Sequence, residues 1–245
     1  MSKKQRESSR ADRAAAIQKE AAAGERNRRL FITLAIVVVL SAVVAGFVIF
    51  SGGGSTATKP TATPPASANA QALVVGSNAS ASYKVVVYED FLCPYCRQFE
   101  TSSRDFLRAY AAKGTVQVEY RPFHLLQDPY STEALSAWAA VLQKGTPQQA
   151  LRFHDVLYDK QPYEQDTSKP DASKLRTWAK EAGVTDTAVL DAIGSDQTSF
   201  VDAADAAAAK AKVQGTPTVF VNGKELSGSS VTDEVDQLEK MLSGG

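Results

Sequence analysis

Two cysteines three positions apart are the residues of this sequence best suited to covalent chemistry. Cys93 and Cys96 are the only cysteines in the 245 residues, and they enclose Pro94 and Tyr95. Secreted domains that rely on structural disulfides carry more cysteines at wider spacing. A disulfide across so short a loop would also constrain the unfolded chain very little. The pair is therefore predicted to be a redox-active dithiol.

The residues around this pair predict that it lies between a strand and a helix. Residues 85–88 are a continuous β-branched and aromatic run, typical of a strand buried on both faces. Pro94 suits the first turn of a helix, because the N–H that it lacks would have no partner there. Cys93 would then occupy the cap position, just beyond the end of a strand, where reactive groups of α/β sheets gather.

This position favours the thiolate of Cys93, the form that acts as a nucleophile. The unpaired N–H groups of the first helical turn and the helix dipole stabilise a negative charge. The dipole alone lowers a pKa by about one unit, so a larger shift needs hydrogen bonds to the sulfur. We predict that the pKa of Cys93 lies well below about 8.5, in the range of about 3.5–7 known for such motifs. Cys96, one turn further in, is predicted to be the shielded resolving thiol.

Zinc binding is the alternative chemistry for two neighbouring cysteines. A zinc site would need two more ligands, and without a third cysteine only His124 and His154 are left. Neither histidine lies at the spacing of a zinc finger, so we predict no metal site. A histidine on an apolar helix face is usually a packed core residue. Neither is therefore predicted to be the base that deprotonates Cys96.

The elements that position the cysteines begin with a strand, a helix and a second strand. Helical spacing of apolar residues continues from Pro94 to about residue 113, and residues 116–120 alternate between apolar and polar. Strands and a helix in this order imply a right-handed parallel crossover. Three apolar stripes at helical spacing then fill residues 128–195, which predicts a helical insertion.

The C-terminal part returns to a mixed pattern. An alanine-rich stretch over 200–212 predicts a helix, and two apolar runs flank the turn Asn222-Gly223, a strong hairpin signal. A last amphipathic helix is expected after Ser230, which can cap it. The whole order is β-α-β, a helical insertion, then α-β-β-α, so the sequence predicts an α/β sandwich with helices inserted between its halves.

The N-terminal part predicts a membrane anchor. Residues 30–50 are 21 residues without a charge, and as a helix they would match a hydrocarbon core of about 30 Å. The basic segment 1–29 precedes them, so the N-terminus is expected in the cytoplasm and the domain over 71–245 on the far side. Residues 51–70, rich in Gly, Ser, Thr, Ala and Pro, predict a flexible linker. A cleaved signal peptide is the alternative for this segment.

The charge of the main part argues against nucleic-acid binding. Residues 51–245 carry 18 Lys and Arg against 23 Asp and Glu, a net charge of −5. Nucleic-acid-binding domains present basic surfaces instead. The basic block lies beside the hydrophobic segment, as expected for membrane topology.

A second motif, Gly215-Thr216-Pro217-Thr218, precedes the predicted hairpin. On its own, Pro217 would be an ordinary proline at the start of a strand. Together, however, the stretches DFLCPYCRQFE (90–100), YRPF (120–123) and VQGTPTVFVNG (213–223) resemble DsbA-like thioredoxin-fold proteins. The resemblance is greatest to the membrane-tethered forms of Gram-positive, especially actinobacterial, cell envelopes.

The resemblance implies a thioredoxin-like fold in which the inserted helices cap the active site. It implies that Pro217 is a cis-proline packed against the cysteine pair, and that Thr216 offers its backbone to an extended substrate. Asp90 matches this branch of the family. Many thioredoxin-fold enzymes carry a buried acid six residues before the first cysteine, and here that position is Val87. The group that deprotonates Cys96 therefore stays open.

The predicted function is an extracytoplasmic dithiol oxidase that introduces disulfides into exported proteins. A thiolate of the substrate would attack the Cys93–Cys96 disulfide at Cys93, and a second substrate thiol would resolve the mixed disulfide. The resemblance implies re-oxidation by a membrane quinone-linked partner of the VKOR or DsbB kind, without a soluble cofactor. A reductase or isomerase of the same fold is one alternative, and a non-catalytic tethered binding or chaperone module is another.

Overall fold

The computed structural model describes residues 64–76 and 81–244. The predicted cytoplasmic segment, the predicted transmembrane helix and most of the predicted linker lie outside these residues. No helix within the described ranges is long and apolar enough to cross a membrane.

A mixed six-stranded sheet forms the centre of the domain, in the order β1-β2-β4-β3-β5-β6. Its central strands β3 and β4 run parallel, and every other neighbouring pair is antiparallel. The parallel pair confirms the predicted crossover through a helix. The strands are β1 (Ala66–Asn69), β2 (Ala72–Val75), β3 (Tyr83–Glu89), β4 (Val116–Pro122), β5 (Thr218–Val221) and β6 (Lys224–Glu225).

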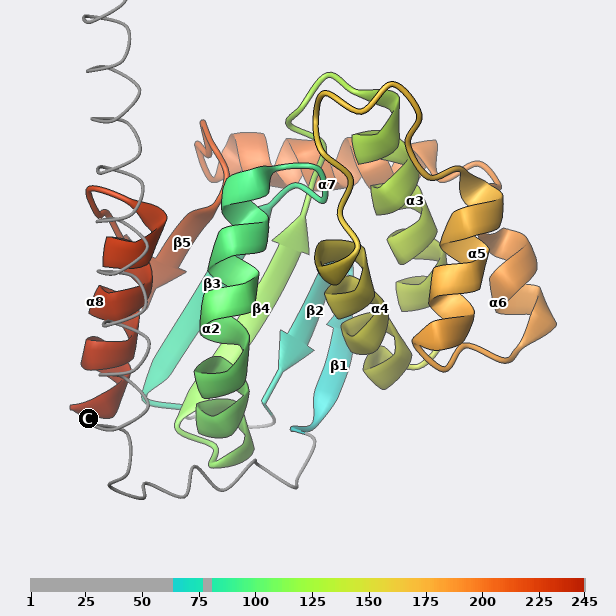
Figure 1. Cartoon of the computed structure of the whole chain (residues 1–245). Coiled ribbons are helices and arrows are strands. Elements are labelled where there is room, and N and C mark those ends of the chain that lie inside the picture. The colour runs from blue at the N-terminus through green and yellow to red at the C-terminus, as the bar shows by residue number, and fades with distance from the viewer. Residues whose placement is uncertain (1–63, 77–80, 245) are drawn as a thin grey trace, which may run out of the picture. The chain divides into compact units, whose positions relative to one another are not determined.

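Helices cover this sheet and extend beyond one of its edges. Figure 1 shows α2, α4 and α8 over the face turned to the viewer, with α7 behind the sheet and α5 and α6 beyond the β1 edge. The helices are α2 (Pro94–Ala112), α3 (Pro129–Lys144), α4 (Pro147–Asp159), α5 (Ala172–Glu181), α6 (Thr187–Ala192), α7 (Thr198–Lys210) and α8 (Val231–Ser243).

The inserted helices α3 to α6 begin at well-formed caps, which explains why they form where they do. Asp128, Asp171 and Asp186 accept a hydrogen bond from the first turn of α3, α5 and α6. Thr146 and Gln149 form a complete capping box at the start of α4. Such caps satisfy N–H groups that would otherwise lack partners, and each stabilises its helix by about 1 kcal/mol.

The apolar stripes of these helices form the core of the insertion. Trp138 of α3, Phe153 of α4 and Trp178 of α5 are all buried, and the indole N–H of Trp138 donates to the carbonyl of Ala150. The predicted α/β fold with a helical insertion is therefore confirmed. The helices α3 to α6 lie within the residues 128–195 assigned to the insertion.

The first hairpin was not expected from the sequence. Strands β1 and β2 pair antiparallel, and β1 lies inside the stretch 51–70 that the sequence assigned to a linker. The assignment is wrong over residues 66–69. The reason is that β1 (Ala-Ser-Ala-Asn) is held at the sheet edge by backbone pairing, which needs no apolar alternation. Its side chains are mostly exposed, so its composition resembles that of a linker.

The second hairpin agrees with its prediction. Asn222 and Gly223 both have positive φ (50° and 80°), as a two-residue turn between β5 and β6 requires. The Asn222 side chain also binds the backbone N–H of Lys84 and the carbonyl of Ser82, which ties the turn to the start of β3. Ser230 caps α8 by accepting a hydrogen bond from the Asp233 N–H.

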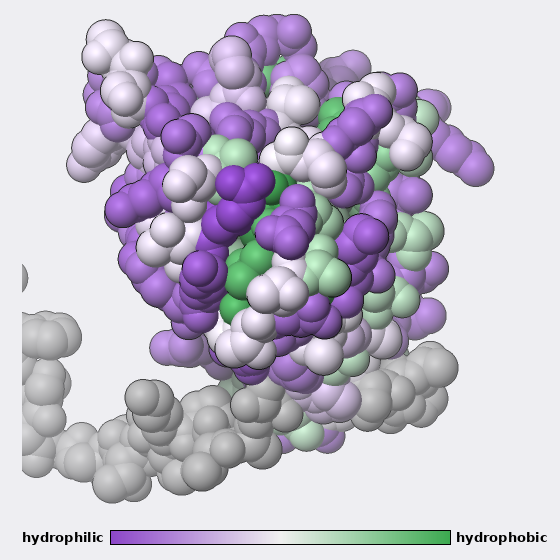
Figure 2. All heavy atoms as spheres, turned by 90° about the vertical axis from the view of Figure 1, so that its right-hand side faces the viewer, coloured by the Kyte–Doolittle hydropathy of each residue, from purple (hydrophilic) through white to green (hydrophobic). Residues whose placement is uncertain are grey.

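The outer face of the insertion is mainly hydrophilic. Figure 2 shows this side, with a narrow strip of hydrophobic side chains among polar ones. Among the described residues, the large exposed hydrophobic side chains are Tyr95, Tyr163 and Met241, none of which belongs to α5 or α6. Tyr95 instead lies between the two cysteines, and Tyr163 lies in the loop after α4.

Candidate active site

The cysteine pair lies where β3 gives way to α2. Strand β3 ends at Glu89, and Pro94 is the first residue of α2. Cys93 is the N-cap with extended backbone angles (φ −68°, ψ 119°), as its position before Pro94 predicts. Both cysteines are free thiols in this structure.

Polar groups around Cys93 favour its thiolate. The pKa of Cys93 is lowered to about 6, first by the hydrogen bond from the Cys96 thiol, while burial acts in the opposite direction. The Thr216 side chain and the backbone N–H groups of Tyr95 and Cys96 lower the pKa further, although Cys93 forms no side-chain cap hydrogen bond in its thiol form. This pKa lies within the range that the sequence predicted.

The Thr216–Pro217 segment reaches the same sulfur from the other end of the chain. The peptide bond between these residues is cis, as the family resemblance implied. The Cys93 thiol donates a hydrogen bond to the carbonyl oxygen of Thr216 over 3.3 Å. The Thr216 hydroxyl has no hydrogen-bond partner among the described residues, so it is available to donate to the sulfur once Cys93 is a thiolate.

Cys96 lies in the opposite electrostatic environment. Its side chain is fully buried, and burial is the main reason why its pKa is raised well above the ordinary value. The hydrogen bond to Cys93 and the charge of Glu89 raise this pKa further. Cys96 therefore holds its proton while Cys93 gives its proton up, as expected for a resolving thiol beside a nucleophile.

Cys93 is more enclosed than the sequence suggested. Only 5% of its surface is exposed, whereas the neighbouring Tyr95 is 61% exposed. The contact with Thr216 contributes to this enclosure, because it closes one side of the sulfur. A protein thiol must therefore displace the Thr216 contact, or approach past the exposed Pro94-Tyr95 corner, to reach Cys93.

The carboxylate of Asp90 fixes the loop that leads to Cys93. It is fully buried and accepts hydrogen bonds from the N–H groups of Leu92, Leu125 and Leu126 and from the hydroxyl of Ser131. These donors belong to the active-site loop, to the segment after β4 and to α3. Asp90 thus joins three parts of the domain and holds the loop before Cys93 in place.

Gln161, just after α4, holds the same loop from the insertion side. Its amide donates to the carbonyl oxygens of Phe91 and Cys93, each over 3.0 Å. The insertion therefore contacts the redox pair directly. Sequence reasoning missed this residue, because a glutamine in a loop carries no local signal of its partner 68 positions away.

A shallow pocket opens beside the cysteine pair. It has a volume of about 330 Å³ and lies between the first turns of α2 and residues 161–165. Leu92, Pro94 and the 65% exposed Tyr163 supply apolar surface, while Arg97 contributes a charge.

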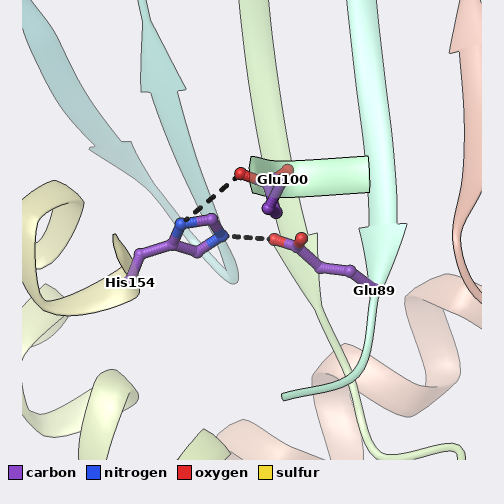
Figure 3. A group of neighbouring side chains, drawn as sticks. All are labelled: Glu89, Glu100 and His154. Carbon is purple, nitrogen blue, oxygen red and sulfur yellow. Dashed lines mark hydrogen bonds and ion pairs between the residues drawn. The ribbon is translucent and has the colours of Figure 1, made fainter. Parts of the chain in front are cut away.

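Three further chemical groups lie beneath the site, and sequence reasoning missed their arrangement. Glu89, Glu100 and His154 are fully buried and face one another (Figure 3). One signal was available in the sequence, because Glu100 follows Cys96 by four residues and so shares its helix face. His124 lies elsewhere, with its Nδ1 at 3.7 Å from Asp205, and does not join this group.

Residues 68–240 match the family model described as Thioredoxin. The chain belongs to the thioredoxin family. No curated protein matches the sequence.

Solved structures refine this placement. DsbA from Mycobacterium tuberculosis is 30% identical, with a TM-score of 0.60, over 71% of this chain and 93% of that one. DsbG from the same organism is 29% identical, with a TM-score of 0.58, over 74% and 87% of the two chains. MdbA from Corynebacterium diphtheriae, at 21% identity and a TM-score of 0.60 over 78% and 99%, supports the fold. The predicted DsbA-like class, a thiol–disulfide oxidoreductase, is confirmed.

Proposed function

We propose that this thioredoxin-family protein is a dithiol oxidase that introduces disulfides into exported proteins through Cys93 and Cys96. The observation that carries the proposal is the opposite pKa shift of the two thiols, with that of Cys93 lowered to about 6 and that of Cys96 raised. A stabilised Cys93 thiolate favours the reduced enzyme, and a stable reduced form makes the disulfide a strong oxidant.

The reaction consists of two thiol–disulfide exchanges. A substrate thiolate attacks the Cys93 sulfur of the Cys93–Cys96 disulfide, a mixed disulfide forms, and the bonding electrons leave on Cys96. A second substrate thiolate then attacks the substrate sulfur of the mixed disulfide, and Cys93 leaves as a thiolate. The low pKa of Cys93 makes it a good leaving group in this second exchange. The substrate loses two electrons, and the enzyme retains them.

Substrate binding is proposed at the two sides of the cysteine pair. Thr216, which precedes the cis-proline Pro217, contacts Cys93 on one side, where the backbone of Thr216 would pair with an extended substrate segment. The pocket beside Pro94 and Tyr163 would receive a substrate side chain on the other side. Such a site would contact the backbone and the apolar side chains of a substrate, so it suits unfolded or folding chains of many sequences.

The cellular setting is proposed from the N-terminal sequence. Residues 30–50 would anchor the protein in the membrane, with segment 1–29 in the cytoplasm and the catalytic domain outside it. A membrane quinone-linked partner of the VKOR or DsbB kind would then re-oxidise the pair near the membrane surface.

Equilibration of the purified protein against glutathione buffers tests the direction of the reaction. A reduction potential of about −120 mV is expected for an oxidase, whereas a value of about −270 mV would identify a reductase. The matches to DsbA and DsbG are nearly equal in identity, so this measurement decides between an oxidase and the alternatives.

Trapping of substrates tests whether the site acts on proteins at all. In the Cys96→Ala variant, Cys96 can no longer attack the Cys93 sulfur of a mixed disulfide and release the bound protein, so mixed disulfides between Cys93 and exported proteins should accumulate in cells. They should disappear on reduction and be absent from the Cys93→Ala variant. A lack of covalent adducts in the Cys96→Ala variant would favour the non-catalytic binding module.

A further inference from the structure

A fully buried group of charged side chains lies under the active site, and the proposed reaction has not yet used it. Glu89 ends β3, Glu100 lies in the second turn of α2, and His154 lies in α4. His154 Nε2 is 2.6 Å from Glu89 Oε1, and His154 Nδ1 is 4.0 Å from Glu100 Oε2 (Figure 3). We refer to these three residues as the Glu–His cluster.

The Glu–His cluster is poor in hydrogen-bond donors. Neither carboxylate oxygen of Glu100 nor Glu89 Oε2 has a hydrogen-bond partner among the described residues. The tyrosines nearest to His154, Tyr120 and Tyr158, place their rings 4.7 and 5.0 Å from its ring, and their hydroxyls also lack partners within the described part of the chain. An ionised carboxylate without donors is costly to bury, so a proton must reside among these groups.

The surroundings of each side chain determine which of the three carry protons. Burial alone would lower the pKa of His154, but the charge of Glu89, the hydrogen bonds to Asp155 and Glu89 and the charge of Glu100 together outweigh burial and raise it. His154 therefore stays protonated and pairs with Glu89. Burial raises the pKa of Glu100, and the charge of Glu89 raises it further, so Glu100 is protonated at neutral pH. One carboxylate, one imidazolium and one neutral acid together carry no net charge.

Two observations place the Glu–His cluster close to Cys96. Glu100 follows Cys96 by four residues, which places both on the buried face of α2. The charge of Glu89 acts on Cys96 and raises its pKa. The acid that many thioredoxin-fold enzymes carry six residues before the first cysteine is replaced by the buried Val87. Cys96 is therefore enclosed, with Glu89 as its charged neighbour.

Cys96 must nevertheless change its protonation state in each catalytic cycle. It leaves the opened disulfide as a thiolate and is a thiol in the reduced enzyme, so it takes up one proton. It loses that proton again before it attacks the Cys93 sulfur. Because the side chain has no exposed surface, the proton must come from and return to a neighbouring buried group.

We propose that the Glu–His cluster is the proton acceptor and donor of Cys96, with Glu89 as the carboxylate that exchanges the proton and His154 and Glu100 as the groups that share it. When the disulfide opens, the Glu–His cluster gives a proton to the Cys96 thiolate. When the disulfide closes, the proton of Cys96 returns to it. This inference rests on the proposed thiol–disulfide exchange and adds the path of its proton.

Other titratable and charged groups also surround this region, and their charges contribute to its proton affinity. They are Asp90 after β3, Cys93, Arg104 and Arg108 at or in α2, Tyr120 in β4, and Asp155 and Tyr158 in α4.

The test separates the two steps of disulfide formation. Reduced full-length protein is mixed with glutathione disulfide, quenched with acid and analysed by mass spectrometry. The Cys93 thiolate first displaces one glutathione and forms a mixed disulfide. Cys96 then attacks the Cys93 sulfur, releases the second glutathione and closes the Cys93–Cys96 bond. Only this second step requires Cys96 to lose a proton.

Glu89→Gln should leave the first step within about twofold and slow the second by about 10²-fold near neutral pH, a typical loss for a general base. The mixed disulfide should then accumulate. The remaining rate should rise about tenfold per pH unit, because hydroxide replaces the missing base. Glu119→Gln, a matched change on β4 outside the Glu–His cluster, should alter neither step.

Glu100→Gln provides a second test. It removes no charge at neutral pH, because Glu100 is protonated there. Glutamine resembles the protonated carboxyl, so this variant should fold normally. In the wild type the rate of the second step should increase as the pH rises through about 8, where Glu100 loses its proton and the Glu–His cluster becomes more basic. This increase should be absent in the variant.

The outcomes distinguish the inference from the proposed function. Equal second-step rates in wild type and Glu89→Gln, or a loss of the same size at every pH, would overturn the inference. Stoichiometric zinc in the reduced protein that is lost in His154→Gln would also overturn it, because metal ligands cannot hold the proton. A wild-type protein that forms no mixed disulfide would instead refute the proposed function.

Discussion

At the scale of single residues, four groups converge on the Cys93 sulfur. The Cys96 thiol, the Thr216 hydroxyl and two backbone N–H groups at the helix start all favour its thiolate. Burial works against them, because the sulfur is largely removed from water. The hydrogen bonds outweigh burial, so the low pKa depends on side chains far apart in the sequence as well as on the CxxC motif.

Thr216→Val should raise the pKa of Cys93 by up to about one unit, because the variant removes one donor and leaves the others in place. Ultraviolet absorbance of the thiolate against pH measures this, with a wild-type midpoint near about 6. Thr218→Val is the matched control, since the Thr218 hydroxyl donates to the Gly215 carbonyl and not to the sulfur. Equal midpoints in wild type and Thr216→Val would contradict this role.

At the scale of elements, the redox loop is held by buried contacts that come from three directions. Asp90 joins it to α3 and to the segment after β4, and Gln161 joins it to the end of α4. The insertion therefore supports the active site through hydrogen bonds. Changes in the insertion should consequently reach the cysteines through these few hydrogen bonds.

Asp90→Asn should destabilise the protein by about 2–4 kcal/mol, because an amide has one acceptor oxygen for donors that the carboxylate serves with two. Ser131→Ala removes one of the four hydrogen bonds and should cost only about 1 kcal/mol. Denaturant unfolding of both variants gives the comparison. Similar losses in the two variants would mean that Asp90 contributes no more than its single bond to Ser131.

The elements differed in how far the sequence could predict them. The strand over 85–88, helix α2 and the Asn222-Gly223 hairpin were predictable, because apolar periodicity and turn chemistry are local signals. The hairpin of β1 and β2 was not, because β1 is held by backbone pairing with β2. Periodicity cannot reveal a strand whose side chains face water.

The site shows the same division. The Cys93–Cys96 pair and the turn at Thr216 and Pro217 follow from short motifs. The pairing of Glu89 with His154 spans 65 positions and depends on how α4 packs against the sheet. No local pattern encodes such a contact, so the sequence left the proton partner of Cys96 open.

At the scale of the whole molecule, the pKa of Cys93 links redox state to stability. A folded-state pKa below the unfolded value stabilises the reduced protein above that folded pKa, and the contribution is lost as the pH falls through it. This extra stability of the reduced protein therefore begins at about pH 6 and increases up to about pH 8.5, the pKa of a free thiol. Above this pH range the raised pKa of Cys96 acts in the opposite direction.

The reduced protein should therefore be more stable than the oxidised protein at neutral pH. The difference should grow by about 1.4 kcal/mol per pH unit between about 6 and 8, since each pKa unit has this value. Denaturant unfolding of both redox forms across this range measures it. Because Glu100 is present in both redox forms, the comparison between them separates the contribution of the thiols from that of the rest of the protein. A difference that does not change with pH would contradict the prediction.

The molecule contains no sulfur atoms beyond its two methionines and this single cysteine pair. It can consequently neither form an incorrect internal disulfide nor hold a second redox-active disulfide. In the proposed oxidase reaction, each substrate would use the whole oxidising capacity of the molecule, and every turnover would include one encounter with an outside electron acceptor. The supply of that acceptor, rather than the concentration of unfolded substrates, should then limit the rate at which one enzyme molecule forms disulfides.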